Sequence, residues 1–195
     1  MNAEKTAALL RALRTERGFT QRELADRLQV SDKTVSKWER AQGCPDISLL
    51  PALAEVFGVR AEQLLRGELS PNRPEGGNLR RMRFFRCPVC GAVTAMSGMG
   101  ELSCCGRVLT PLMPQPEEEE HTLTVEPLEE EWLLTFSHPM EKAHYLAFVA
   151  AVTEERLLLV RLYPEQGGEL RLPILRRGRL YFCCSRDGLF YREIR

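Results

Sequence analysis

Residues 20–40 read TQRELADRLQVSDKTVSKWER, a stretch that predicts two short helices joined by a tight turn. Thr20 is a good N-cap, and Glu23 three residues later completes a capping box, which satisfies free backbone N–H groups at the start of a helix. Ser31 is placed to cap the second helix. The apolar residues at helical spacing are Leu24, Ala25, Leu28, Val35 and Trp38. The stretch therefore predicts a helix pair that packs its apolar side inward.

Further helices are expected on both sides of this pair. Before it, Leu9, Leu10 and Leu13 form an apolar stripe, and Gly18 ends that helix. After it, Pro51 suits the first turn of a fourth helix. The apolar residues of the fourth helix and of a short fifth helix are Leu50, Leu53, Ala54, Phe57, Leu64 and Leu65. Residues 1–69 are therefore predicted to form an all-α bundle.

The helix pair resembles the phage-repressor (XRE) helix-turn-helix family. The resemblance covers about residues 6–67 and includes Pro45-Asp46 and Phe57-Gly58-Val59, while Gln29 stands where the turn commonly has Gly. It implies that the second helix of the pair enters the major groove of double-stranded DNA, which is about 12 Å wide. A single module of this kind buries little surface, so we expect a homodimer on a two-fold DNA site.

The resemblance also implies roles for polar residues of the helix pair. Asp32, Lys33 and Lys37 are expected to contact base edges, whereas Gln21 and Arg40 suit phosphates, as does Ser36, and such contacts position the protein without reading sequence. The alternative is a solvated helix face with no partner. The full candidate DNA-binding set is Gln21, Ser31, Asp32, Lys33, Thr34, Ser36, Lys37 and Arg40.

Charge and hydropathy limit the function classes. Net charge is zero over the 195 residues, so nucleic-acid binding must rest on the motif and not on overall charge. Charge is uneven, because residues 115–195 carry 10 basic and 15 acidic side chains. No apolar run reaches the roughly 18 to 20 residues of a membrane span, and the start of the chain does not resemble a signal peptide. We therefore expect a cytoplasmic protein without membrane contact.

A change of composition predicts the domain boundaries. Residues 70–79 are rich in turn formers and suggest a flexible linker between a helical domain at 1–69 and the rest. We expect a metal knuckle at 80–114 and a β-domain at 115–195, so the fold class is multidomain α plus β. The arginines at the start of the knuckle, which suit either phosphate contacts or an ordinary basic surface, are Arg80, Arg81, Arg83 and Arg86.

Two closely spaced cysteine pairs indicate a metal site. Cys87 and Cys90 form a Cys-Pro-Val-Cys knuckle, and Cys104 and Cys105 follow after a gap of 13 residues. Four thiolates make a tetrahedral set suited to zinc or iron, and the rival interpretation is a disulfide or redox pair. The segment Glu101-Leu102-Ser103-Cys104-Cys105-Gly106 resembles the desulforedoxin-type iron centre of desulfoferrodoxins. That resemblance implies iron held by four thiolates, in a geometry that zinc also occupies.

Short strands alternate with turns after an extended acidic connector at residues 114–120. Seven strands at this spacing favour an antiparallel, immunoglobulin-like β-sandwich. The expected strands are 122–126, 132–136, 145–153, 156–162, 169–172, 179–184 and 189–194.

The three histidines of the chain lie between or beside these strands, at His121, His138 and His144. With Cys184 they resemble the superoxide reductase domain of desulfoferrodoxins, whose iron is held by four histidines and an axial cysteine. The resemblance covers roughly residues 115–195 and implies an iron site in which Cys184 takes the axial place. Asp187 stands where the fourth histidine belongs, and a carboxylate there adds negative charge, which should favour ferric iron.

The acidic residues before His121 also depart from that family. Glu119 keeps the place of a glutamate that can cap the iron, whereas Glu120 replaces a lysine that would attract superoxide. Efficient superoxide reduction is therefore not expected.

Three functions follow from these features. The first is a DNA-binding transcription regulator in which metal or redox state alters the spacing of two DNA-binding domains. The second is a superoxide reductase tethered to DNA. The third is a regulator whose metal folds serve only for structure, dimerisation or docking.

Overall fold

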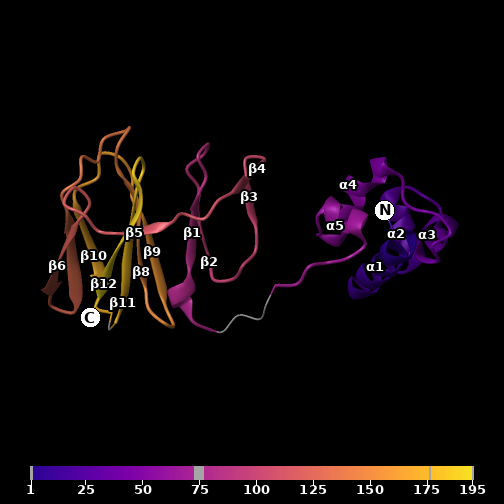
Figure 1. The fold of residues 1–195 in the computed structure, drawn as a ribbon, viewed down its shortest axis with the longest axis horizontal. Helices are drawn as coiled ribbons and strands as arrows, with labels where there is room; N and C mark the ends of the chain where they lie inside the picture. Colours follow the sequence, from indigo (N-terminus) through magenta and orange to yellow (C-terminus); the bar gives the residue numbers. More distant parts are fainter. Residues whose placement is uncertain (1, 73–76, 176, 195) are drawn as a thin grey trace. The chain divides into compact units, whose positions relative to one another are not determined.

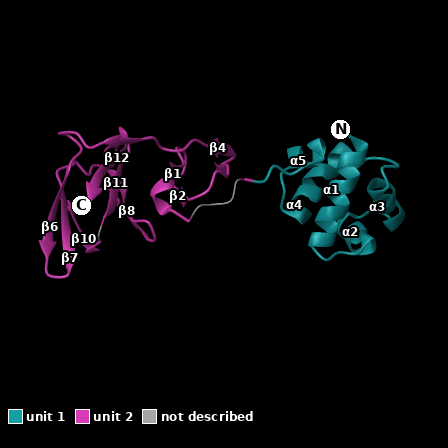
Figure 2. Ribbon diagram, turned by 60° about the horizontal axis from the view of Figure 1, so that its bottom comes forward, with its two compact units in different colours: residues 1–71 teal, residues 72–195 magenta. Residues whose placement is uncertain are grey.

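The computed structural model describes residues 2–72, 77–175 and 177–194 and divides the chain into two compact units. Residues 1–71 form a helical unit and residues 72–195 a β-unit (Figures 1 and 2). Each has its own hydrophobic core, so each is described by itself. Of the predicted linker, residues 73–76 lie outside the described residues.

The helical unit contains all five predicted helices. Thr20 and Glu23 form the expected capping box, and Ser31 caps the third helix. Trp38 is buried with the leucines of the other helices in one core. The elements are α1 (Ala3–Glu16), α2 (Gln21–Leu28), α3 (Asp32–Glu39), the 3-10 turn η1 (Ile47–Leu49), α4 (Leu50–Phe57) and α5 (Ala61–Arg66). Among the described residues, no helix is both long enough and apolar enough to cross a membrane.

A buried ion pair joins the first helix to the third. Arg14 on α1 donates to both carboxylate oxygens of Glu39 on α3, at 2.6 and 3.0 Å. Gln21, at the start of α2, donates to the same carboxylate at 2.8 Å, and Arg14 also binds the carbonyl of Phe19 at 2.6 Å. Only 3% of the Glu39 side chain is exposed, so the carboxylate is held almost entirely by protein donors.

The β-unit begins with two small hairpins that form the metal knuckle. The first pairs β1 (Arg83–Arg86) with β2 (Val93–Met96), after a 3-10 turn at Leu79–Arg81. The second pairs β3 (Leu102–Cys104) with β4 (Arg107–Leu109). Phe85 and Cys87 are buried in a small core of their own with Leu109.

All seven strands expected in the sandwich are present, in two sheets (Figure 1). A three-stranded sheet has the order β10-β7-β6, and a five-stranded sheet has the order β5-β12-β11-β8-β9. Their facing sides enclose the main core, which includes Leu134, Phe136 and Phe182. The strands are β6 (Leu123–Leu128), β7 (Glu131–Phe136), β8 (Leu146–Val152), β9 (Leu157–Arg161), β10 (Glu169–Pro173), β11 (Gly178–Cys184) and β12 (Gly188–Ile194).

An eighth strand was not predicted. Within the stretch expected to be only a connector, β5 (Pro114–Pro116) pairs with β12, in parallel, whereas the other pairs of both sheets are antiparallel. Its two prolines argue against a strand by propensity, but an edge strand tolerates proline because one side has no partner. The sequence interpretation of this segment was therefore incomplete.

The outer face of the five-stranded sheet is covered by the knuckle. Phe84 of β1 lies 5.4 Å from Phe148 and 5.1 Å from Tyr181, measured between ring centroids. Every residue of β8 is buried as a result, because this strand has the main core on one face and β1 on the other. Knuckle and sandwich therefore share a second apolar layer.

The ion pair in the helical unit makes a testable prediction. We expect Glu39→Gln to lower the free energy of unfolding by about 2 kcal/mol, because it leaves the Arg14 charge without its buried partner. Burial raises the pKa of Glu39, but hydrogen bonds from Arg14 and Gln21 outweigh burial and leave it below its usual range. The difference in the free energy of unfolding between the wild type and Glu39→Gln should therefore be largest at neutral pH. It should shrink as pH falls below the ordinary pKa of glutamate.

Chemical denaturation across pH measures both effects. The matched control is Glu68→Gln, which removes an exposed ion pair with Lys5 at 3.3 Å and should cost well under about 1 kcal/mol. Equal losses for the two variants would contradict the prediction.

Candidate metal centres and nucleic-acid interface

The exposed face of α3 carries the three side chains expected to contact bases. Asp32, Lys33 and Lys37 are all exposed, and the two lysines are four residues apart and so share one side of the helix. On the opposite side, Val35 and Trp38 are buried in the helical core. The polar face of α3 is therefore held from behind by apolar packing.

Four of the other five candidate DNA contacts have side-chain partners inside the helical unit, namely Gln21, Ser31, Thr34 and Arg40. Ser31 accepts the backbone N–H of Thr34 at 3.1 Å, and the two hydroxyl oxygens are 2.7 Å apart. Gln21 donates to the carboxylate of the α1–α3 ion pair, and the Arg40 Nε donates to the carbonyl of Ser36 at 3.2 Å. These bonds orient the ends of α2 and α3, so any DNA contact would have to be compatible with them.

The four clustered cysteines converge in the knuckle, and we call them the four-thiolate site. The sulfurs of Cys87, Cys90, Cys104 and Cys105 all lie within 4.8 Å of one another. Gly91, with a φ of +70°, lets the first pair turn back so that its N–H reaches the Cys87 carbonyl at 2.9 Å. The shortest approach, 3.5 Å between Cys90 and Cys104, is far longer than a disulfide bond of about 2.0 Å. The seven cysteines are free thiols, and the arrangement suits one tetrahedral ion.

The thiols of this site differ in acidity. The backbone N–H groups of Cys90 and Val89 point at Cys87 and lower the pKa of its thiol to about 6. Hydrogen bonds with the neighbouring thiols, Cys90 first, raise the pKa of Cys104 to about 12. Cys87 is therefore ionised at neutral pH, whereas Cys104 would need a bound cation to stabilise its thiolate.

The three histidines and one cysteine also converge, at one end of the sandwich, and we call them the histidine site. The ligand atoms of His121, His138, His144 and Cys184 all lie within 4.8 Å of one another. His121 precedes β6, His138 and His144 flank the β7–β8 loop, and Cys184 ends β11. His121 is 8% exposed and stacks on Phe190 at 4.2 Å, which fixes the plane of its ring.

Asp187 lies beside three of these ligand atoms. Its Oδ2 is 3.1 Å from the Nε2 of His121, 3.1 Å from the Nε2 of His144 and 3.1 Å from the sulfur of Cys184. Ligand atoms at right angles around one metal, with bonds of about 2.1 Å, are about 3 Å apart. The spacing of Asp187 therefore suits a fifth ligand, in the place that the resemblance assigns to the fourth histidine.

His138 provides the test of whether this site suits a metal. Both of its ring nitrogens are buried, and neither has a hydrogen-bond partner. Burial, together with charge on His144 and His121, lowers the pKa of His138 to about 4, so the ring is neutral. Buried ring nitrogens without a hydrogen-bond partner are costly, and a metal ion would satisfy one of them. The residues present therefore fit the metal that the resemblance implies.

Glu119 lies outside the ligand cluster. It is exposed and lines an open pocket over His121 and Asp187, together with Glu118 and Glu120. We call this pocket the mouth of the histidine site.

Two arginines connect the knuckle to the sandwich through hydrogen bonds, which the sequence analysis did not predict. Arg86, which precedes Cys87, is half-buried and donates to the Ser185 carbonyl and the Tyr145 hydroxyl, both at 3.4 Å. Arg161 on β9 donates to the Gly91 carbonyl at 2.9 Å. The Arg86 side chain therefore points into the sandwich and is not available to contact a phosphate. Residue type alone does not predict this orientation.

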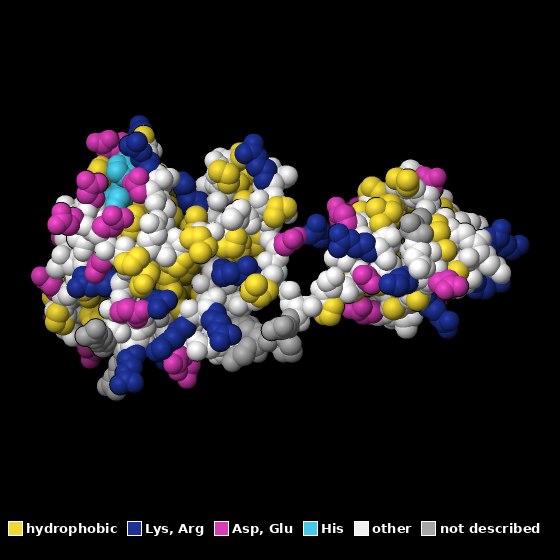
Figure 3. Space-filling view, in the orientation of Figure 1, with side chains coloured by type: hydrophobic (Ala, Val, Ile, Leu, Met, Phe, Trp, Pro, Cys, Tyr) yellow, Lys and Arg dark blue, Asp and Glu magenta, His cyan; other side chains and the backbone are white. Residues whose placement is uncertain are grey.

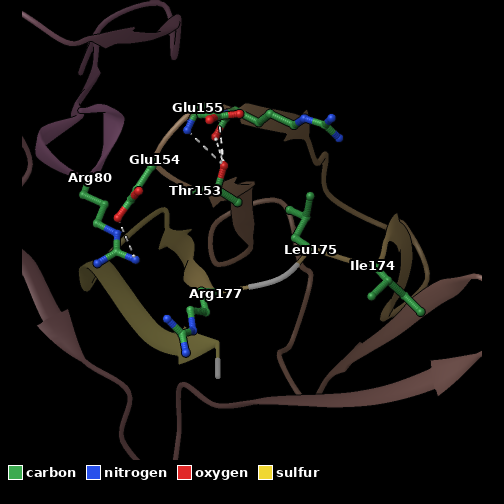
Figure 4. A pocket seen from close by; sticks show the side chains of 8 residues that line it. Arg80, Thr153, Glu154, Glu155, Ile174, Leu175 and Arg177 are labelled. Atoms are coloured by element: carbon green, nitrogen blue, oxygen red, sulfur yellow. Dashed lines mark hydrogen bonds and ion pairs between the residues drawn. The ribbon is translucent and has the colours of Figure 1, made fainter. Parts of the chain in front are cut away.

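A further open pocket lies at the β8–β9 turn (Figure 4). Arg80 forms an ion pair with Glu154 there at 3.3 Å, and Thr153 and Arg177 also line it. None of its lining residues belongs to the four-thiolate or histidine site.

Comparisons with known proteins divide the chain at the same place. A family model described as Helix-turn-helix matches residues 10–64. The HTH-type transcriptional activator BcrR of Enterococcus faecalis is 41% identical over 59 residues, which are 30% of this chain and 29% of that protein. The chain thus spans less than a third of the activator's length. Desulfoferrodoxin of Desulfarculus baarsii is 25% identical over 97 residues, which cover 46% of this chain and 77% of that one.

Two solved structures are also similar to parts of the chain. The superoxide reductase from Treponema pallidum has a TM-score of 0.49 and 20% identity, and the match covers 57% of this chain and 96% of that one. The clp gene regulator ClgR from Corynebacterium glutamicum has a TM-score of 0.32 and 30% identity, over 34% of this chain and 71% of that one. From the sequence matches, the chain carries a helix-turn-helix domain at its N-terminus, followed by a region homologous to desulfoferrodoxin.

Proposed function

We propose that this protein is a sequence-specific DNA-binding transcription regulator that responds to metal bound in its β-unit. The observation that carries the DNA-binding part is the exposed face of α3 within residues 10–64, the segment matched by the helix-turn-helix family. Lys33, Lys37 and Asp32 would contact base edges in the major groove, while the Gln21 and Arg40 side chains would approach the backbone. The small size of one such domain favours a homodimer on a two-fold site.

The metal-responsive part rests on two convergent ligand sets. Cys87, Cys90, Cys104 and Cys105 would hold iron or zinc. His121, His138, His144 and Cys184, completed by Asp187, would hold iron, with Glu119 close to the open side. A bound iron would gain positive charge on oxidation, and the surrounding ligands and hydrogen bonds could rearrange in response. We propose that loss or oxidation of metal alters the spacing of the two DNA-binding domains.

Superoxide reduction is a weaker candidate for the histidine site. The homology to desulfoferrodoxin favours it, but Asp187 adds a negative ligand and three glutamates line the mouth. A superoxide anion approaching that mouth would be repelled. The alternative is that the metal serves only for structure. The comparison of DNA affinity with and without metal, described below, distinguishes this role from sensing.

The first prediction concerns base contacts. We expect Lys37→Ala to weaken binding to a duplex selected from random DNA by about 10- to 100-fold, because a base contact is worth about 1–3 kcal/mol. Fluorescence anisotropy measures the affinity at fixed salt. Lys5→Ala, which removes a cation of α1 that pairs with Glu68, is the control. Equal losses in the two variants would argue against recognition through α3.

The second prediction concerns the response to metal. We expect the affinity for the same duplex to differ by about 5- to 150-fold between metal-loaded and metal-free protein, the usual range of coupling between two sites. Cys104→Ser should reduce the response, because it removes one of the four thiolates. Identical affinities for loaded, metal-free and oxidised protein would rule out sensing and support a structural role.

The third prediction concerns Asp187. We expect Asp187→His to keep metal at the histidine site and to raise its reduction potential, because a neutral ligand stabilises the ferric state less than a carboxylate does. Asp187→Ala should weaken metal binding by about 10- to 100-fold. Metal analysis and a redox titration of the thiolate-to-iron absorption band measure both. Glu141→Ala, which removes an exposed carboxylate of the β7–β8 loop outside the ligand cluster, should change neither. An unaltered potential in Asp187→His would refute the assignment of Asp187 as a ligand.

A further inference from the structure

The mouth of the histidine site is strongly acidic. Glu118, Glu119 and Glu120 line it beside His121 and Asp187, and its remaining lining residues are Gln115 and Phe190. Figure 3 shows histidine side chains at the surface of the β-unit, with several acidic side chains and some basic ones next to them. Among the described residues, no lysine or arginine lines this pocket.

Local backbone structure places these carboxylates at the entrance. Glu118 and His121 are joined by two backbone hydrogen bonds, of 3.3 and 2.9 Å, which close a tight turn immediately before β6. Glu118, Glu119 and Glu120 are exposed on this turn, and within the described part of the chain none of them has an ion-pair partner. The preceding Glu117 differs, since it pairs with Arg192 at 3.5 Å. The negative charge of the turn is therefore not neutralised locally.

The nearby cations lie outside this pocket. Lys142, in the loop between two histidines, pairs with Glu165 at 3.9 Å. Arg186 is exposed in the turn between Cys184 and Asp187, and it does not line the pocket. A cleft lined by one sign of charge raises the local concentration and the association rate of the opposite ion by about 10- to 1000-fold at low salt.

The ligands beneath the mouth suit a cation. The three imidazoles and the Cys184 sulfur converge, the Asp187 carboxylate lies 3.1 Å from the His121 ring, and the buried ring nitrogens of His138 have no hydrogen-bond partner. Building on the function proposed above, we propose that this mouth draws in a hydrated divalent cation and excludes anions. The histidine site is then an exchangeable metal site through which the regulator monitors divalent metal supply, and not a site for superoxide.

Association kinetics test this inference. The four-thiolate site is first filled with one equivalent of Zn²⁺, and Co²⁺ is then added in a stopped-flow experiment that follows the thiolate-to-cobalt band. Cys184→Ser should abolish this band and so assign it to the histidine site. Glu118→Gln combined with Glu120→Gln should slow Co²⁺ binding by about tenfold at low salt, and about 0.5 M salt should remove the difference.

The matched control also removes two glutamate charges, but at a turn far from the mouth of the histidine site. Glu129→Gln with Glu130→Gln alters two exposed glutamates on the β6–β7 turn, at the far end of β6 from His121, and should leave the rate unchanged. Glu120→Lys should slow Co²⁺ further and strengthen the binding of azide to the cobalt form. Equal rates in the mouth variant and the wild type, equal slowing in the control, or no Co²⁺ binding would overturn the inference. Because no DNA is present, this outcome is independent of whether metal alters operator affinity.

Discussion

The packing of Phe84 against Phe148 and Tyr181 is the interaction on which the β-unit depends. The knuckle has only two short hairpins and a small core, too little to fold stably without a partner surface or a metal. By placing one aromatic ring of β1 on the outer face of the five-stranded sheet, the chain gives the knuckle that surface. The half-buried arginines Arg86 and Arg161 then add hydrogen bonds on either side of the four-thiolate site.

Local features of the sequence predicted most of the elements, whereas the long-range contacts either were missed or were expected only from the resemblance. The capping box of Thr20 and Glu23 is a local interaction, so residue identity was enough to predict where α2 begins. Strand β5 was missed because its pairing with β12 is a long-range interaction that two prolines conceal. The Cys-x-x-Cys spacing predicted that four sulfurs would meet, because a short loop can close in few ways. The proximity of Asp187 to two histidines instead depends on how three loops assemble.

The two ligand sets meet different physical demands. The four-thiolate site is made within two hairpins, and its sulfurs are partly exposed, so its geometry is local. The histidine site gathers side chains from three separate loops and leaves both buried ring nitrogens of His138 without a hydrogen bond. That ring costs free energy in the metal-free fold, roughly 1–3 kcal/mol for an unsatisfied buried group. A metal bound at the histidine site would therefore also stabilise the fold of this end of the sandwich.

The end of strand β11 joins the two apolar layers of the β-unit. Its last two residues are neighbours in sequence, yet Cys184 belongs to the main core and the histidine site, while Cys183 belongs to the apolar layer beneath β1. The pairing of β11 with β8 changes register between these two residues, so the backbone is bent at that point. Cys183 and Cys184 therefore connect the apolar layer beneath β1 to the histidine site through a single peptide bond. A shift of Cys184 on metal binding would move the neighbouring residue that packs beneath the knuckle.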